Sequence, residues 1–105
     1  MNRLSILYKK EGLETQAFLK GALVSLAAIN LKSLLYNKIV TQEKLVVDLT
    51  RVTEIDTTAI NTLFQTQMHC DALNAAMVLK CPSDHPINKL LRLTHAARQF
   101  DIVRT

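Results

Sequence analysis

The segment from Thr53 to Thr58 brings together the side chains best suited to chemistry. It reads Thr-Glu-Ile-Asp-Thr-Thr, so three hydroxyls and two carboxylates lie within six consecutive residues. The segment separates an apolar run from a stretch with helical spacing, which places it at the start of a helix. A short side-chain oxygen at that point accepts a hydrogen bond from the unpaired amides of the first turn. Asp56, Thr57 or Thr58 is therefore expected to be the N-cap.

A threonine at a helix start is also suited to phosphorylation. A phosphate there meets free amides and the positive end of the helix dipole. Glu54 and Asp56 would make the modified surface strongly acidic, so that a docked partner would be repelled. The sequence thus predicts a partner-docking surface made of polar side chains near the helix start: Glu54, Asp56, Thr57, Thr58, Asn61 and Thr62.

The histidines and cysteines do not form a pattern typical of a catalytic or metal site. His69, His85 and His95 have no nucleophile motif around them, and each is interpreted as an exposed or turn histidine. Adjacent His69 and Cys70 point to different sides of a helix, and Cys81 with His85 lacks a second pair at zinc spacing. We expect no metal, no cofactor and no catalysis, with both cysteines acting as small apolar residues near the core.

Composition limits the class of protein. The chain has 105 residues, 49% of them hydrophobic and 21% charged, which is typical of one folded domain spanning residues 1–105. The formal net charge is +4, but only Lys9 and Lys10 are adjacent basic residues, so direct nucleic-acid binding is not indicated. The two glycines, Gly12 and Gly21, cannot build a phosphate-binding loop.

Hydropathy and cysteine usage indicate a cytoplasmic protein. The most apolar stretch, residues 17–36, is interrupted by Lys20 and Lys32, so it does not predict a membrane span. Glu11 and Glu14 precede it, which argues against a secretory leader. Two cysteines in a chain of this size do not make a disulfide framework, and a reduced compartment is expected.

The periodicity of apolar residues predicts the order β-β-α-β-α-β-α-β. This is an α/β single domain with helices packed on a mixed sheet. Strands are expected near residues 4–8, 17–19, 45–49, 76–79 and 100–103, and the first two should form a hairpin. Helices are expected from residue 25 to about 39, from about 60 to 72, and from about 83 onward.

Several local features follow from the same patterns. The run at residues 45–49 is typical of a central strand covered on both faces, followed by a connection over residues 51–55. Leu34 and Ile39 are expected on the buried stripe of the first helix and Met68 on that of the second. Ser83-Asp84 is expected to cap the last helix, with Pro86 in its first turn.

From Leu45 to Ile102 the chain resembles the STAS domain, the family of bacterial anti-sigma factor antagonists and related regulatory modules. The residues that carry the resemblance are Leu45-Val46-Val47-Asp48-Leu49-Thr50, Val52, Ile55-Asp56-Thr57-Thr58-Ala59, Leu63, Leu79 and Leu90-Leu91-Arg92-Leu93-Thr94. The first forty residues match only in element order and in Gly21 followed by Leu23.

The resemblance implies that Thr57 occupies the phosphorylated position and Thr58 the second hydroxyl position of the family motif. A serine/threonine kinase, itself an anti-sigma factor or switch protein, would bind the unmodified surface and phosphorylate it to break the complex. The domain would then regulate transcription by partner switching, without catalysis of its own. Ala59 replaces the usual motif glycine, and His95-Ala96 stands where a helix-ending Gly-Leu is usual.

The resemblance also extends to a second branch of the family. This is the small cytoplasmic STAS subunit of the bacterial ABC transporter that maintains outer-membrane lipid asymmetry. In that case Thr57 would contact the ATPase subunit rather than carry a phosphate. A third interpretation, an enzyme or small-ligand carrier on this fold, is disfavoured because the sequence has no acid–base cluster.

Overall fold

The element order matches the predicted one. The computed structural model describes residues 4–93 and 100–104. Its elements are β1 (Ser5–Glu11), β2 (Glu14–Leu23), α1 (Ser25–Tyr36), β3 (Lys44–Ile55), α2 (Thr57–Ala72), β4 (Ala76–Cys81), α3 (Ile87–Leu93) and β5 (Asp101–Arg104). The predicted β-β-α-β-α-β-α-β order is therefore confirmed, as is the hairpin of the first two strands.

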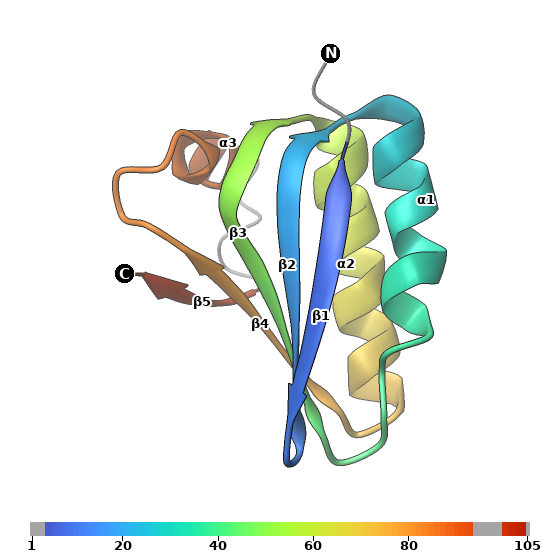
Figure 1. The fold of residues 1–105 in the computed structure, drawn as a ribbon. Helices are drawn as coiled ribbons and strands as arrows, with labels where there is room; N and C mark the ends of the chain where they lie inside the picture. Colours follow the sequence, from blue (N-terminus) through green and yellow to red (C-terminus); the bar gives the residue numbers. More distant parts are fainter. Residues whose placement is uncertain (1–3, 94–99, 105) are drawn as a thin grey trace.

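The strands form one mixed sheet in the order β1-β2-β3-β4-β5 (Figure 1). β1 and β2 pair antiparallel, and every other neighbouring pair is parallel. Each parallel connection carries a helix, as the geometry of crossovers requires. The carboxyl ends of β2 and β3 therefore lead directly into the starts of α1 and α2, at one edge of the sheet.

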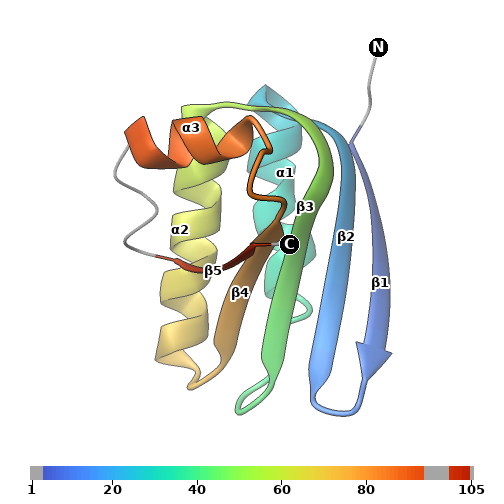
Figure 2. The same ribbon diagram turned by 90° about the vertical axis from the view of Figure 1, so that its left-hand side faces the viewer.

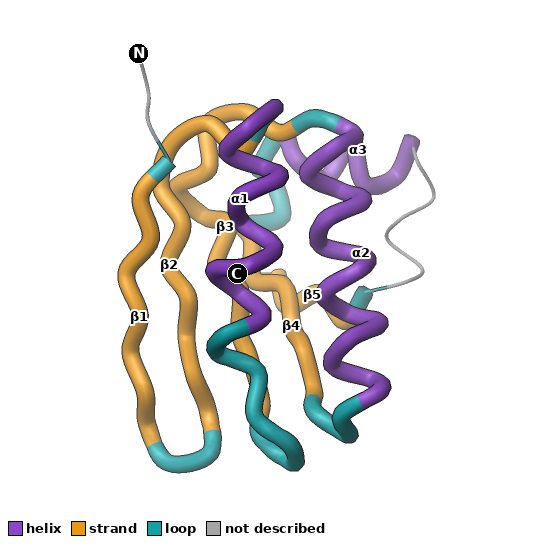
Figure 3. The backbone as a smooth tube through the Cα atoms, turned by 90° about the vertical axis from the view of Figure 1, so that its right-hand side faces the viewer, coloured by secondary structure: helices purple, strands orange, loops and turns teal. Residues whose placement is uncertain are grey.

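The two long helices lie side by side on one face of the sheet (Figure 3). None of the described helices covers the opposite face of β1, β2 and the amino-terminal part of β3, and α3 lies near the carboxyl end of β3 (Figure 2). The prediction that residues 45–49 are covered on both faces is wrong. Only Leu45, Val47 and Leu49 are buried apolar positions on this segment, while Val46 is half-exposed on the other side.

The core fills the space between the sheet and the two long helices. Alternate residues of the strands point into it, since successive side chains of a strand face opposite sides. Its fully buried large side chains are Leu19, Leu23, Leu31, Leu35, Leu45, Val47, Leu49, Leu63, Met77, Leu79, Ile87 and Leu91. Cys70 and Cys81 are buried free thiols in the same cluster, which confirms their interpretation as small core residues.

Strand β3 is longer than the apolar pattern indicates. Residues 51–55, expected to be a connection, continue the strand to Ile55. The pairing of β3 with β2 shifts twice, between Phe18 and Lys20 and between Gly21 and Ala22 of β2. Each shift adds one residue of β3 opposite β2, which interrupts the alternation by which a strand is recognised.

The helices differ from the prediction in detail. Leu34 and Met68 are exposed rather than buried, and Ile39 lies beyond the end of α1. At α3 the capping acceptor is neither Ser83 nor Asp84: the Ile87 N–H donates to His85 Nδ1 at 3.2 Å. The structure places Pro86 directly before the helix rather than within its first turn. The departure at His95-Ala96 lies outside the described residues.

Candidate functional site

Asp56 is the residue that organises the Thr53–Thr58 segment. It precedes α2 in an extended conformation, and its Oδ1 accepts a hydrogen bond from the Ala59 N–H at 2.9 Å. This is the N-cap arrangement, in which a side-chain oxygen satisfies an unpaired amide of the first turn. Of the three residues left open as caps, Asp56 takes the role, and the threonine hydroxyls are not used for it.

The second oxygen of Asp56 reaches the other long helix. Its Oδ2 accepts a hydrogen bond from the Ser25 N–H at 3.0 Å. Ser25 has a φ of 54°, a left-handed conformation that side chains other than Gly and Asn adopt rarely. One carboxylate thus fixes the starts of α1 and α2 relative to each other, and the chain segments that flank it share one edge of the sheet.

Thr57 is the first residue of α2, and its side chain is exposed. Its hydroxyl forms no hydrogen bond with the part of the chain that the structure describes. Thr58 is half-exposed, and the Glu54 and Asn61 side chains are exposed on the same stretch. An uncommitted hydroxyl at a helix N-terminus is open to modification, and a phosphate placed there would meet the first-turn amides.

Thr62 does not belong to this surface. It is only 6% exposed and lies on the face of α2 that packs against the core, where its backbone carbonyl accepts a hydrogen bond from Thr66 Oγ1 at 2.8 Å. Thr62 is thus buried rather than exposed, and we leave it out of the expected docking surface. We define the motif surface as the remaining residues: Glu54, Asp56, Thr57, Thr58 and Asn61.

Exposed apolar side chains that were not predicted lie near the motif surface. Leu26 is 72% exposed and Ile29 is 57% exposed, both in the first half of α1. Leu26 directly follows Ser25, which is bonded to Asp56. Large apolar side chains that are exposed one helical turn apart form a small apolar patch, which favours a docking role. Leu26 and Ile29 are three residues apart, a helical spacing that the buried residues Ala28 and Leu31 share. Sequence periodicity alone therefore does not distinguish the exposed residues of α1 from the buried ones.

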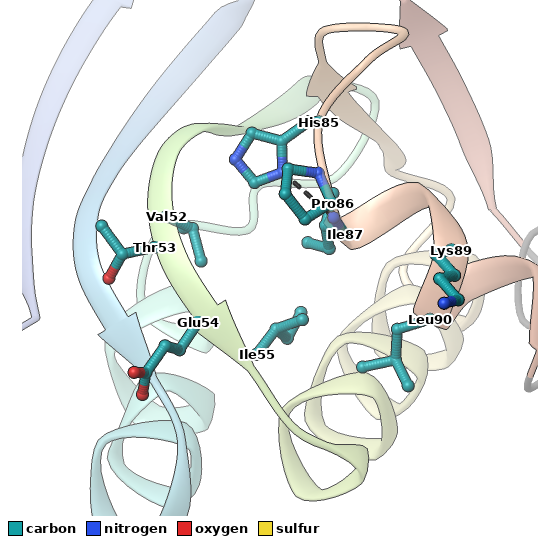
Figure 4. Close-up of a pocket in the computed structure, with 9 residues that line it drawn as sticks. All are labelled: Val52, Thr53, Glu54, Ile55, His85, Pro86, Ile87, Lys89 and Leu90. Carbon is teal, nitrogen blue, oxygen red and sulfur yellow. Dashed lines mark hydrogen bonds between the residues drawn. The ribbon is translucent and has the colours of Figure 1, made fainter.

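A groove of about 360 Å³ lies on the other side of the motif, between the end of β3 and the start of α3 (Figure 4). The side chains of Ile55 and Leu90 point toward one another across it, while Glu54 points away. His85 stands at its rim, with its Nδ1 used by the Ile87 N–H. The lining is largely apolar, and it carries no acid–base pair joined by a hydrogen bond.

The other predicted groups do not converge on a site. Burial, and to a smaller extent the charge of Asp71, raises the pKa of the Cys70 thiol to about 11, so it is protonated at neutral pH. The His69 ring is stacked on the Tyr36 ring at a centroid distance of 4.2 Å. Across residues 4–93 and 100–104, no three His, Cys, Asp or Glu side chains group in a way that would hold a metal.

The fold and the site define a small α/β domain with a mixed sheet and an exposed hydroxyl segment at the start of its second long helix. The chain belongs to the STAS domain family, whose model matches residues 7–105. None of the described helices has the length and hydropathy needed to cross a membrane. Comparison with curated protein sequences finds no match.

Solved structures share this fold at low sequence identity. An anti-sigma factor antagonist from Mycobacterium paratuberculosis superposes with a TM-score of 0.84 at 14% identity, covering 98% of this chain and 87% of that one. The anti-sigma factor antagonist SpoIIAA in its unphosphorylated form gives 0.75 at 13% identity, covering 94% and 88%. The phosphorylated form of Bacillus SpoIIAA gives 0.68 at 12% identity, covering 94% and 91%.

Proposed function

We propose that this protein is a cytoplasmic regulatory module that docks a protein partner through the motif surface and releases it when Thr57 is phosphorylated. The observation that carries the proposal is the position of Thr57. It follows the N-cap Asp56, starts α2, and exposes a hydroxyl that makes no hydrogen bond with the described residues. The partner would be a serine/threonine kinase of the anti-sigma or switch-protein type, which is consistent with structural relatives that are named anti-sigma factor antagonists and with one that is described in a phosphorylated form.

The different hydrogen bonding of Asp56 and Thr57 supports this role. Asp56 uses both carboxylate oxygens on backbone amides, so it holds the two helix starts in place. Thr57 has no such task, and modifying it leaves these bonds intact. A phosphate would add about −1.5 to −2 charges beside Glu54 and Asp56. The expected result is a changed surface on an unchanged fold.

The surroundings of the motif supply the contact area for a partner. Leu26 and Ile29 lie on one side, and the groove lined by Ile55 and Leu90 lies on the other. Apolar anchors next to a charged rim are the usual composition of a protein interface. The new charge would then act on a partner held mainly by apolar contacts nearby. No feature of the described residues specifically favours the transporter alternative.

The test is to map the modification. Protein isolated from its own cells, and protein incubated with its kinase and ATP, would be digested and analysed by mass spectrometry. The expected phosphate is on Thr57, and Thr57→Ala should abolish it. The matched control is Thr58→Ala, which removes the neighbouring hydroxyl and should still be modified. Phosphate found only on Thr58, or on a residue outside the motif surface, would overturn the assignment.

A further inference from the structure

Figure 2 shows the sheet from the face opposite α1 and α2. This face carries a second, larger groove. Its volume is about 680 Å³, within the range of small-molecule sites. It lies across β1 to β4 and is separate from the motif surface. Its lining residues are Ser5, Leu7, Phe18, Leu19, Lys20, Asp48, Thr50, Arg51 and Lys80.

An irregularity in β3 brings a guanidinium into this groove. Phe18 pairs with Asp48 but Lys20 pairs with Arg51, so a single residue of β2 lies opposite two residues of β3. As a result Thr50 and Arg51 are both exposed although they are consecutive, and both line the groove. Bulges of this kind redirect side chains and are over-represented beside functional sites. Arg51 is thereby set directly opposite Lys20.

The charge of the groove is unbalanced. Lys20, Arg51 and Lys80 line it, and none of them forms an ion pair with a carboxylate of the described residues. Asp48 is the only acidic residue in the lining; it is 9% exposed, and its Oδ1 accepts a hydrogen bond from the Thr50 N–H at 2.9 Å. Three cations against one partly used carboxylate favour an anion as the occupant.

Apolar side chains lie next to the cations in the register of the sheet. Leu7 and Phe18 are opposite each other on β1 and β2, and they are 74% and 37% exposed. Phe18 is two residues from Lys20, which is about 7 Å along a strand. Further along the same face, Val46 pairs with Val78, and both are half-exposed. The face thus passes from a cationic end to an apolar strip.

We propose that this groove binds a single-chain amphiphile with an anionic head group. The head, a carboxylate or a phosphate, is held by Arg51, Lys20 and Lys80, because a guanidinium fork matches the oxygens of either group. The alkyl chain lies over Phe18 and Leu7 toward Val46 and Val78, where burying it removes apolar surface from water. This site is independent of the docking role proposed above, since it uses the opposite face of the sheet.

The binding test uses dodecanoate and dodecyl phosphate, each below its critical micelle concentration, titrated into the full-length protein by calorimetry. Amide shifts in a nitrogen–proton correlation spectrum locate the site. Both ligands should bind with unit stoichiometry and shift the amides of β2 and β3 around Phe18 and Arg51. Acetate, inorganic phosphate and the uncharged dodecyl maltoside should bind at least about tenfold more weakly, since each lacks one of the two recognised parts.

Substitutions separate the head site from the chain site. Arg51→Gln should weaken dodecanoate binding at least about tenfold, and Leu7→Ser, at an exposed position, should weaken it several-fold. The matched control is Lys32→Gln, which removes the same charge from exposed α1 on the opposite face and should leave affinity unchanged. If Arg51→Gln does not fold, Lys80→Gln tests the same head site.

Three results would overturn the proposal. One is no binding of either amphiphile up to its solubility limit. Another is equal weakening by Arg51→Gln and Lys32→Gln, which would mean that only net charge matters. The third is co-sedimentation with phosphatidylglycerol vesicles in the absence of monomer binding, which would assign the cationic face to a membrane surface instead.

Discussion

Asp56 and Ser25 lie 31 residues apart in the sequence and are joined by a hydrogen bond of 3.0 Å from the Ser25 N–H to Asp56 Oδ2. The other oxygen of Asp56 caps α2 through the Ala59 N–H. The acidic residue of the motif is therefore structural, and it holds together the two helix starts beside which Thr57 lies.

Two substitutions of Asp56 should destabilise the fold by different amounts. Asp56→Ala removes the cap and the bond to Ser25, and we expect a loss of about 1 to 3 kcal/mol of unfolding free energy. Asp56→Asn keeps an acceptor for the Ala59 N–H but presents an amide group to the Ser25 N–H, so its loss should be smaller. Urea denaturation of both variants measures this. An Asp56→Asn protein as stable as the wild type would show that the link to Ser25 contributes nothing, and equal losses in the two variants would show that the cap contributes nothing.

The backbone at Ser25 offers an independent check on the same junction. Its φ of 54° is strained for a β-branched side chain. Ser25→Val should therefore lower the unfolding free energy by about 1 to 2 kcal/mol, whereas Ser25→Gly should leave it within about 1 kcal/mol of the wild type because glycine adopts this conformation freely. Thermal unfolding followed by circular dichroism distinguishes them, and a Ser25→Val protein as stable as Ser25→Gly would contradict the assigned conformation.

The exposed apolar residues of α1 should contribute to partner affinity and not to stability. Leu26→Ser changes a side chain that is 72% exposed, so the melting temperature should stay nearly constant. Its affinity for the partner should fall about tenfold or more if Leu26 is an interface anchor. Leu34→Ser is the matched control, because Leu34 is also exposed on α1 but lies eight residues further from the motif. Equal effects of the two substitutions would remove Leu26 from the docking surface.

The buried thiol of Cys70 should make the unfolding free energy depend on pH in the alkaline range. Burial raises its pKa from 9.0 to about 11, so the folded state keeps the proton over a range in which the unfolded state loses it. The contribution is fully present below pH 9 and is lost as the pH rises through about 11. Urea denaturation across this range should show falling stability, with a shallower slope in Cys70→Ala. An identical slope in that variant would assign the dependence elsewhere.

The predictable part of the fold rests on apolar runs that no bulge interrupts. Residues 45–49 and 76–79 identified β3 and β4, because each segment is a nearly continuous apolar run between two stretches with helical spacing. The extension of β3 to Ile55 was missed because its two register shifts break the period of two. Likewise nothing in the sequence indicates that the sheet has an uncovered face, since coverage depends on where both long helices pack.

The position of the site along the chain was predictable, but which of its side chains are buried and which are exposed was not. The order Asp56-Thr57-Thr58 located the helix start, and a residue of cap type was expected there. Thr62 was misplaced because a threonine on the buried face has the same polarity as one in solvent, and its environment differs only through packing against the core. Leu26 was not recognised as exposed because an apolar side chain in solvent has the same hydropathy as one in the core. The hydrogen bond from the Ser25 N–H to Asp56 was not predictable because a backbone amide has no sequence signature.

The central claim is that a phosphate on Thr57 releases the partner while the fold persists. The direct measurement uses protein with phosphothreonine incorporated at position 57, compared with unmodified protein by calorimetric titration of the partner and by thermal unfolding. We expect affinity to fall by roughly 5- to 150-fold, a coupling of about 1 to 3 kcal/mol, with nearly the same melting temperature. Unchanged affinity, or a loss of affinity that accompanies unfolding, would contradict the switch.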